Sequence, residues 1–156
     1  MADFFRVFGT LPPLATVMER LGTIDTFSSN SHQASQARDQ FPKYAAAIAN
    51  GIGPKVTSTQ LRRFYTYVKS IEMANRHKEP GSPEIKDKYK LRFILPKIAG
   101  TGKKERESLE DLYKILGVCL QDGSKIKTVA DLRVFVEFFE AILDYHASRD
   151  KSENQN

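Results

Sequence analysis

The chain has 156 residues, of which 40% are hydrophobic and 28% are charged, values typical of a folded protein of one domain. No run of about 18 apolar residues is present, which excludes a membrane-spanning helix, and the N-terminal pattern lacks the basic and apolar regions of a secretory signal. The single cysteine, Cys119, excludes an intrachain disulfide scaffold and a cysteine-based zinc site, and it favours a cytoplasmic location.

The net charge of +5 hides an uneven distribution. Residues 41–106 hold 15 Lys and Arg against 5 Asp and Glu, an excess of +10, whereas the remainder holds 9 against 14. Such a basic segment favours a polyanionic partner. Because its cations are interleaved with helix patterns and aromatic residues, we expect this partner to be a nucleic acid rather than a membrane.

The first forty residues differ from the rest. The first ten are strongly apolar, and residues 14–21 have the spacing of a short amphipathic helix. Residues 28–40 contain no large apolar side chain, so we expect a linker or mobile loop outside the core. The predicted organisation is an N-terminal appendage with a polar linker at 1–40, a helical bundle at 41–150 and a disordered tail at 151–156.

The first helix of the bundle is expected over residues 41–52, where apolar residues share one face and Gly51 and Gly53 precede the end. Lys55 follows, just before the N-terminus of the next helix. Free backbone donors and the positive end of the helix dipole suit such a position for a phosphate group. Lys55 is therefore a candidate contact, with a solvated turn lysine as the alternative.

The next helix, expected over residues 57–76, has a well-specified start. Thr57 and Gln60 have the spacing of a capping box, and apolar residues recur at i, i+3 and i+4 along one face. Arg62, Lys69 and Arg76 recur every seven residues on another face, and two such steps drift only about 40° around the helix. These cations form a stripe, which is either a solvated face or a binding surface.

A Pro- and Gly-containing loop is expected over residues 77–88. Residues 88–99 again have helical spacing, and Pro96 should kink this helix or remove a turn of hydrogen bonds. The cations of this region are Lys90 and Lys97 on one side, Arg92 elsewhere on the circumference, and Lys103 and Lys104 in the flexible connection that follows.

Two further helices complete the chain. The first, over about 105–121, should bury Tyr113 beside several leucines, and its first turns carry acids that complement the helix dipole. The second, over about 128–148, opens with a capping-box pattern and is apolar over more than half its circumference, so we expect it to be central or to contact a second subunit. No strand pattern is found. The predicted fold class is all-α, a compact bundle of about five or six helices.

No constellation of residues supports an enzyme. The stretch GTGKK lacks the preceding strand, the spacing and the hydroxyl residue of a phosphate-binding loop. His32, His77 and His146 have no partner at a metal-ligand spacing, so we expect no catalytic residue, metal or cofactor. A ribonuclease that uses His77 is one open alternative. A DNA-binding regulator is another, against which the long loop after Arg76 argues.

Three segments, in order and spacing, resemble a known family. They are TSTQLRRFY, LPKIAGTGKK and FVEFFEAILDYH. Together they resemble the small subunit of the type III-A CRISPR effector, the Csm complex, over about residues 44–146. Gly100 stands where the family often has a tyrosine, and Lys103 stands where arginine is common. A lysine keeps the charge but loses the two-pronged phosphate contact of arginine.

The resemblance implies a non-catalytic, RNA-binding subunit of an antiviral complex. It would hold guide RNA and target RNA without sequence readout, contact the other Csm subunits and stack by self-association into a filament. The alternative is a scaffold subunit whose basic stripe contacts acidic protein faces, with RNA binding secondary. The match to family motifs assigns RNA contacts to Arg62, Arg63, Lys97 and Lys103, and the charge distribution adds Lys55, Lys69, Arg76, Lys90, Arg92 and Lys104.

Overall fold

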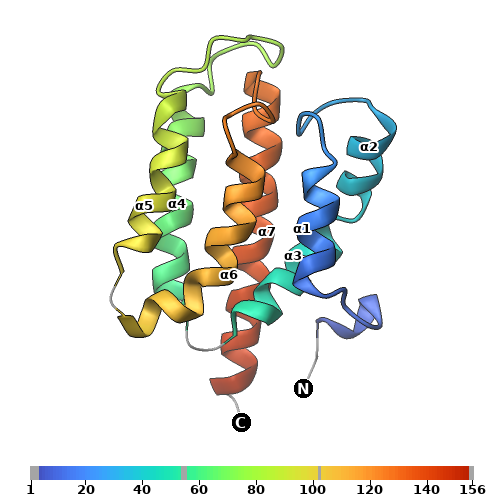
Figure 1. Ribbon diagram of the computed structural model, residues 1–156, viewed down its shortest axis with the longest axis vertical. Coiled ribbons are helices and arrows are strands. Elements are labelled where there is room, and N and C mark those ends of the chain that lie inside the picture. The colour runs from blue at the N-terminus through green and yellow to red at the C-terminus, as the bar shows by residue number, and fades with distance from the viewer. Residues whose placement is uncertain (1–3, 54–55, 102, 155–156) are drawn as a thin grey trace.

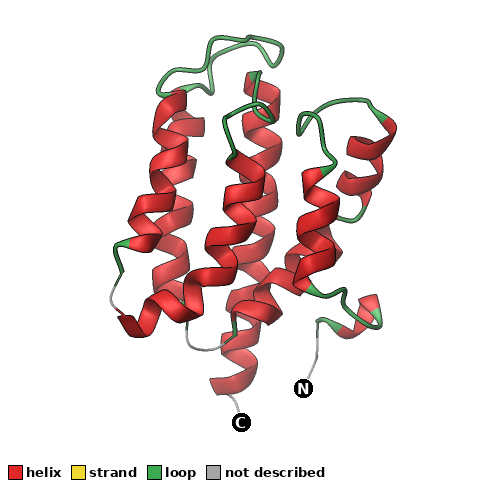
Figure 2. Ribbon diagram, in the orientation of Figure 1, coloured by secondary structure: helices red, strands yellow, loops and turns green. Residues whose placement is uncertain are grey.

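The computed structural model describes residues 4–53, 56–101 and 103–154. In these ranges the fold is all-α, as the sequence predicted, and no strand is present (Figure 2). The elements are η1 (Arg6–Phe8), α1 (Leu14–Gly22), α2 (His32–Asp39), α3 (Phe41–Ile52), α4 (Ser58–Ala74), η2 (Lys88–Phe93), α5 (Ile94–Ala99), α6 (Lys103–Leu120) and α7 (Val129–Asn154), where η marks a 3-10 helix.

Helix α7 is the centre of the bundle. Helices α3 and α4 both pack against it, and α6 packs against α1, α3 and α5 (Figure 1). Phe135 and Phe139 of α7 are completely buried and lie in the same hydrophobic cluster as Phe27 and Leu61. The wide apolar arc of α7 is therefore explained by neighbours within the chain on more than one side.

Residues 28–40 do not form the loop that the sequence predicted, because they contain helix α2. The Ser31 hydroxyl caps this helix by accepting a hydrogen bond from the Ala34 backbone at 3.2 Å. Ala34 and Ala37, spaced three residues apart, are buried against the rest of the molecule. Alanine fills the space when a helix lies close to its neighbour, so the lack of large apolar residues does not keep this segment out of the core.

Two buried polar residues connect the N-terminal segment to the start of α7. Asp131 accepts hydrogen bonds from the Ser28 backbone at 2.8 Å and from the Ser28 hydroxyl at 2.5 Å. Lys125 is 5% exposed, and its ammonium group donates to the Gly22 carbonyl at 3.1 Å and to the Ile24 carbonyl. The ammonium group thus provides hydrogen bonds to carbonyl groups at and just after the C-terminal end of α1, where a positive charge also complements the helix dipole.

Residues 88–99 differ from the single kinked helix that was expected. They form η2 followed directly by α5, and the change from 3-10 to α geometry occurs at Ile94, two residues before Pro96. Pro96 lies in the first turn of α5, where its missing N–H group is best tolerated. Leu91, Ile94 and Ile98 are buried, as their spacing predicted.

Helix α6 corrects one predicted core residue. Tyr113 is 40% exposed, whereas Ile115 is completely buried. Both positions lie at the margins of the apolar arc of α6, so spacing alone did not separate them. Within the described ranges, no helix combines the length and the apolarity that crossing a bilayer requires.

Candidate nucleic-acid interface

The described cations of the predicted site lie on two adjacent elements. Helix α4 and the η2–α5 segment lie side by side (Figure 1), and Tyr67 of α4 donates a hydrogen bond to the Lys90 carbonyl of η2 at 2.7 Å. Lys55 lies outside the described residues. Lys103 and Lys104 belong to the first turn of α6, where the side chains lie outside the described part of the chain. The remaining cations are Arg62, Arg63, Lys69 and Arg76 on α4 and just after it, and Lys90, Arg92 and Lys97 on η2–α5.

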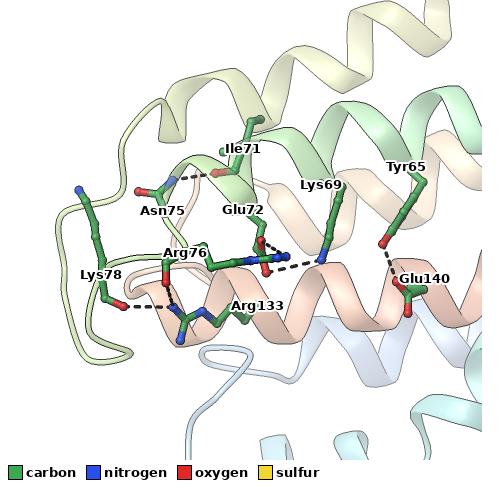
Figure 3. A network of polar contacts seen from close by, with 9 residues as sticks. All are labelled: Tyr65, Lys69, Ile71, Glu72, Asn75, Arg76, Lys78, Arg133 and Glu140. Carbon is green, nitrogen blue, oxygen red and sulfur yellow. Dashed lines mark hydrogen bonds and ion pairs between the residues drawn. The ribbon is translucent and has the colours of Figure 1, made fainter.

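The stripe of Arg62, Lys69 and Arg76 contains a carboxylate from the same helix. Glu72 is 8% exposed, and its carboxylate accepts a hydrogen bond from Arg76 at 3.2 Å and lies 3.6 Å from the Lys69 ammonium group (Figure 3). These pairs have the i, i+3 and i, i+4 spacings that bring helix side chains together. The charges of two stripe residues are therefore partly neutralised within the chain.

The edge of α7 beside this stripe is also acidic. Tyr65 of α4 donates a hydrogen bond to the Glu140 carboxylate at 2.5 Å (Figure 3), and burial, followed by this bond, raises the pKa of Tyr65. Burial and then Glu140 raise the pKa of Asp144, and the positive charge of Arg62 offsets part of that rise. The exposed Arg62 thus lies within electrostatic range of an α7 carboxylate.

The loop after α4 is fixed at both ends by polar contacts. The buried Asn75 amide donates to the carbonyls of Ile71 and Lys86 at 2.8 and 3.0 Å, and its oxygen accepts from the Lys86 backbone at 2.7 Å. Arg133 of α7 donates to the carbonyls of Arg76 and Lys78 at 2.9 and 3.1 Å (Figure 3). The position of η2 relative to α4 is therefore set by hydrogen bonds as well as by apolar packing.

A second group of cations surrounds an open groove between α4 and η2–α5, which we call the aromatic groove. It has a volume of about 590 Å³. Lys97 places its ammonium group 4.9 Å from the centre of the Tyr67 ring, a cation–π contact. Arg63 lies one helical turn before Tyr67 on the same side of α4. The groove is lined by Tyr67, Tyr89, Lys90, Phe93, Pro96 and Lys97.

Lys90 and Lys97 lie together, as their spacing predicted, since both line the aromatic groove. The sequence prediction did not include the three aromatic residues that line the groove with them. Tyr89 and Phe93 alternate with cations in the stretch KYKLRF, and this alternation was the available signal. Helical spacing also places both rings on the side of the segment away from Leu91, and the structure leaves them exposed while Leu91 is buried.

The three histidines lie apart in the fold. His32 begins α2, and His77 is exposed in the loop after α4. His146 is completely buried in α7 with its Nε2 atom 3.2 Å from the Gly53 carbonyl, a packing position. Among the described residues, no three His, Cys, Asp or Glu side chains form a group that could hold a metal ion. Burial raises the pKa of Cys119 to about 12, so this thiol is not a nucleophile at neutral pH.

Comparison with known proteins adds one finding. A family model described as Csm2 Type III-A matches residues 35–152, about three quarters of the chain. It covers α3 to α7 and therefore both groups of cations. The search of curated proteins and the search of solved structures each found no match.

Proposed function

The chain belongs to the Csm2 type III-A family, the small subunit of the type III-A CRISPR Csm complex, and from this premise we propose that it is a non-catalytic subunit that binds RNA. The exposed cations of α4 and η2–α5 contact the phosphate backbone of guide or target RNA. Because such contacts carry no base information, the subunit holds RNA without reading its sequence.

One observation carries the RNA assignment. Arg62 and Arg63 are adjacent and both exposed at the start of α4, and among the described residues neither forms an ion pair within 4.0 Å of a carboxylate. They point about 100° apart on the helix, so Arg62 lies in the stripe and Arg63 lies on the Tyr67 side of α4, beside the aromatic groove. The pair thus connects the two groups of cations into one basic surface.

The family also supports partners beyond RNA. A small subunit of the Csm complex associates with the other Csm subunits. We extend this to self-association: several copies stack along the RNA as a filament and present their basic surfaces in series. Each copy then adds phosphate contacts, and the affinity of the assembly rises with the length of RNA covered.

Charge reversal at Arg62 and Arg63 tests the RNA assignment. The affinity for a single-stranded RNA is measured across a salt series for the wild-type chain and for Arg62→Glu with Arg63→Glu. Each phosphate contact on a single strand contributes about −0.7 to the slope of log affinity against log salt. We therefore expect the variant to bind more weakly and its slope to be shallower by about 1.4.

A matched control separates local contacts from net charge. Arg20→Glu with Lys127→Glu changes the net charge by the same amount at exposed positions on α1 and in the segment before α7. We expect this control to keep most of the affinity and the slope. If both double variants weaken binding equally, or if neither does, α4 does not provide the RNA contact.

The ion pairs of Glu72 favour a second candidate function. Arg76 of the stripe forms an ion pair with the Glu72 carboxylate at 3.2 Å. A carboxylate from a neighbouring subunit would bind the stripe through the same kind of contact. In that case the stripe is a protein contact, and RNA binding is secondary. Charge reversal at Lys69 and Arg76 would then abolish co-purification with the other Csm subunits and leave the RNA affinity of the isolated chain unchanged.

A further inference from the structure

The aromatic groove leaves large rings open to solvent. Tyr89 is 65% exposed and Phe93 is 53% exposed, and they are two of the six large hydrophobic side chains exposed in the described part of the chain. Their ring centres lie 6.2 Å apart with the planes at 86°. Exposed apolar surface of this kind marks a binding site when it is gathered in a concave region.

The third ring of the groove is already occupied. The Lys97 ammonium group lies over the face of Tyr67, and the Tyr67 hydroxyl is bonded to the Lys90 carbonyl. Tyr67 therefore holds η2 against α4 and positions Lys97. The Lys90 ammonium group lies farther from the Tyr89 ring, 6.0 Å from its centre. Tyr89 and Phe93 are both mostly exposed, so theirs are the rings that a further planar group can reach.

The charge around these rings favours an anionic ligand. Residues 88–104 contain six Lys and Arg and no Asp or Glu. Lys90 is partly neutralised, since its ammonium group lies 3.7 Å from the Asp87 carboxylate, but Lys97 has no carboxylate within 4.0 Å among the described residues. Arg63, one helical turn before Tyr67 on the same side of α4, adds a further cation beside the residues that line the groove. The groove thus combines flat apolar surfaces with positive charge.

A nucleotide has the same two parts: a planar base and a charged phosphate. Aromatic side chains that stack on bases, flanked by cations that follow the backbone, are the common means of binding single-stranded nucleic acid. We propose that the aromatic groove stacks an unpaired RNA base on Tyr89 or Phe93, while Lys97 and Arg63 contact the adjacent phosphates. This proposal deepens the RNA-binding function proposed above and depends on it.

A protein partner is less well matched to the groove. A peptide segment that covered Tyr89 and Phe93 would have to remove the water from Lys97 and Arg63 without providing a carboxylate for each, which costs free energy. An RNA strand brings one phosphate for every base. The cations and the rings are then satisfied by consecutive parts of one ligand.

The first test compares two oligonucleotides of equal charge: a single-stranded oligouridylate and the same strand with several internal abasic positions. We expect wild-type protein to bind the complete strand more tightly. Replacing both rings, Tyr89→Ala with Phe93→Ala, should weaken binding of the complete strand about five- to hundredfold and remove its advantage over the abasic strand. The salt slope should stay unchanged, because no cation is removed.

Tyr113→Ala is the matched control. Tyr113 is an exposed aromatic residue on α6, outside the aromatic groove, and its removal should leave both affinities unchanged. Both Tyr89 and Phe93 are largely exposed, so we expect the double variant to fold, and circular dichroism and thermal unfolding verify this before binding is measured.

The second test reports on stacking directly. The chain contains no tryptophan, so Tyr89→Trp places a single indole at the groove and keeps a ring that can stack. At saturation, the complete strand should quench the indole fluorescence and the abasic strand should quench it much less.

The outcomes separate the two proposals. If the protein binds neither strand in either test, the RNA-binding function itself is wrong for the isolated chain. If it binds both strands equally, with no effect of the ring variants and no quenching, RNA contact stands and base stacking is overturned. If the ring variants instead lose association with another subunit and keep their RNA affinity, the groove is a protein contact and the stacking proposal is also overturned.

Discussion

The carboxylate of Asp131 is the most highly connected side chain at the start of α7. It is 1% exposed, and it accepts hydrogen bonds from the backbones of Ser28, Lys127 and Thr128 at 2.8, 2.9 and 2.9 Å. Burial by itself raises the pKa of Asp131, but the hydrogen bonds from the Ser28 side chain and from the three backbone groups outweigh it, and the pKa lies below its ordinary value. The folded state therefore favours the charged form.

We predict that Asp131→Asn destabilises the protein by about 2 kcal/mol or more at pH 7, because an amide offers one oxygen to these donors and adds two donors of its own. Since the pKa is depressed in the folded state, the stabilisation is fully present above the unfolded-state pKa of about 3.9 and is lost as the pH falls through the lower folded-state value. Urea unfolding at several pH values measures both effects.

The variant should accordingly lack this part of the acid dependence. Asp39→Asn, at an exposed position at the end of α2, is the control and should change the free energy of unfolding by less than about 0.5 kcal/mol. Equal unfolding midpoints for the two variants at pH 7 would contradict the role given to Asp131.

Among the elements, α4 has a start that the sequence predicted in atomic detail. The Gln60 backbone donates to the Thr57 hydroxyl at 3.1 Å, and the Thr57 backbone donates to the Gln60 side chain at 2.8 Å, so both halves of the capping box are present. Capping depends on residues close in sequence and on local geometry. It is therefore accessible to pattern analysis in a way that packing between distant elements is not.

We predict that Thr57→Ala lowers the free energy of unfolding by about 1 kcal/mol through loss of this cap. Thr59→Ala, the same substitution two residues later at an exposed position inside α4, should be neutral or slightly stabilising because alanine is the better helix former. Denaturant unfolding of the two variants under the same conditions gives the comparison. Equal midpoints would mean that the capping box contributes nothing.

The elements that the sequence misplaced share a physical reason. The burial of Ala34 in α2 depends on how closely another helix approaches, and the choice between Tyr113 and Ile115 on α6 depends on which neighbour covers each margin of the apolar arc. Each is decided by tertiary contacts, which periodicity along one element does not contain.

In the candidate site, too, the sequence predicted the local properties and missed those that depend on contacts between side chains. The sequence predicted which segments carry the cations, because charge is a property of composition, and it predicted that Lys90 and Lys97 lie together. It did not predict that Glu72 pairs with Lys69 and Arg76, although their spacings permit this. The RNA contacts themselves stay predictions, and the structure directs attention from Lys69 and Arg76 to Arg62, Arg63 and Lys97.

At the scale of the whole molecule, the N-terminal segment contributes to the core. Val17, Leu21, Ile24 and Phe27 are each at most 2% exposed, and they belong to the same hydrophobic cluster as the core residues of α3, α6 and α7. Lys125 and Asp131 add polar contacts between the two parts. The expected division at residue 40 stays a prediction, and these contacts argue for a single folding unit instead.

Truncation distinguishes the two descriptions. Burial of four such side chains stabilises the fold by roughly 6–12 kcal/mol, which is comparable to the entire stability of a typical domain, about 5–15 kcal/mol. We therefore predict that a chain lacking residues 1–40 loses cooperative thermal unfolding and binds a hydrophobic dye. A chain lacking residues 1–9, which removes η1 and its exposed or half-buried side chains, should still unfold cooperatively. If the longer truncation unfolds in one sharp transition near the wild-type temperature, residues 1–40 are an appendage, and the basic surface of α4 and α5 stands on a bundle that does not need them.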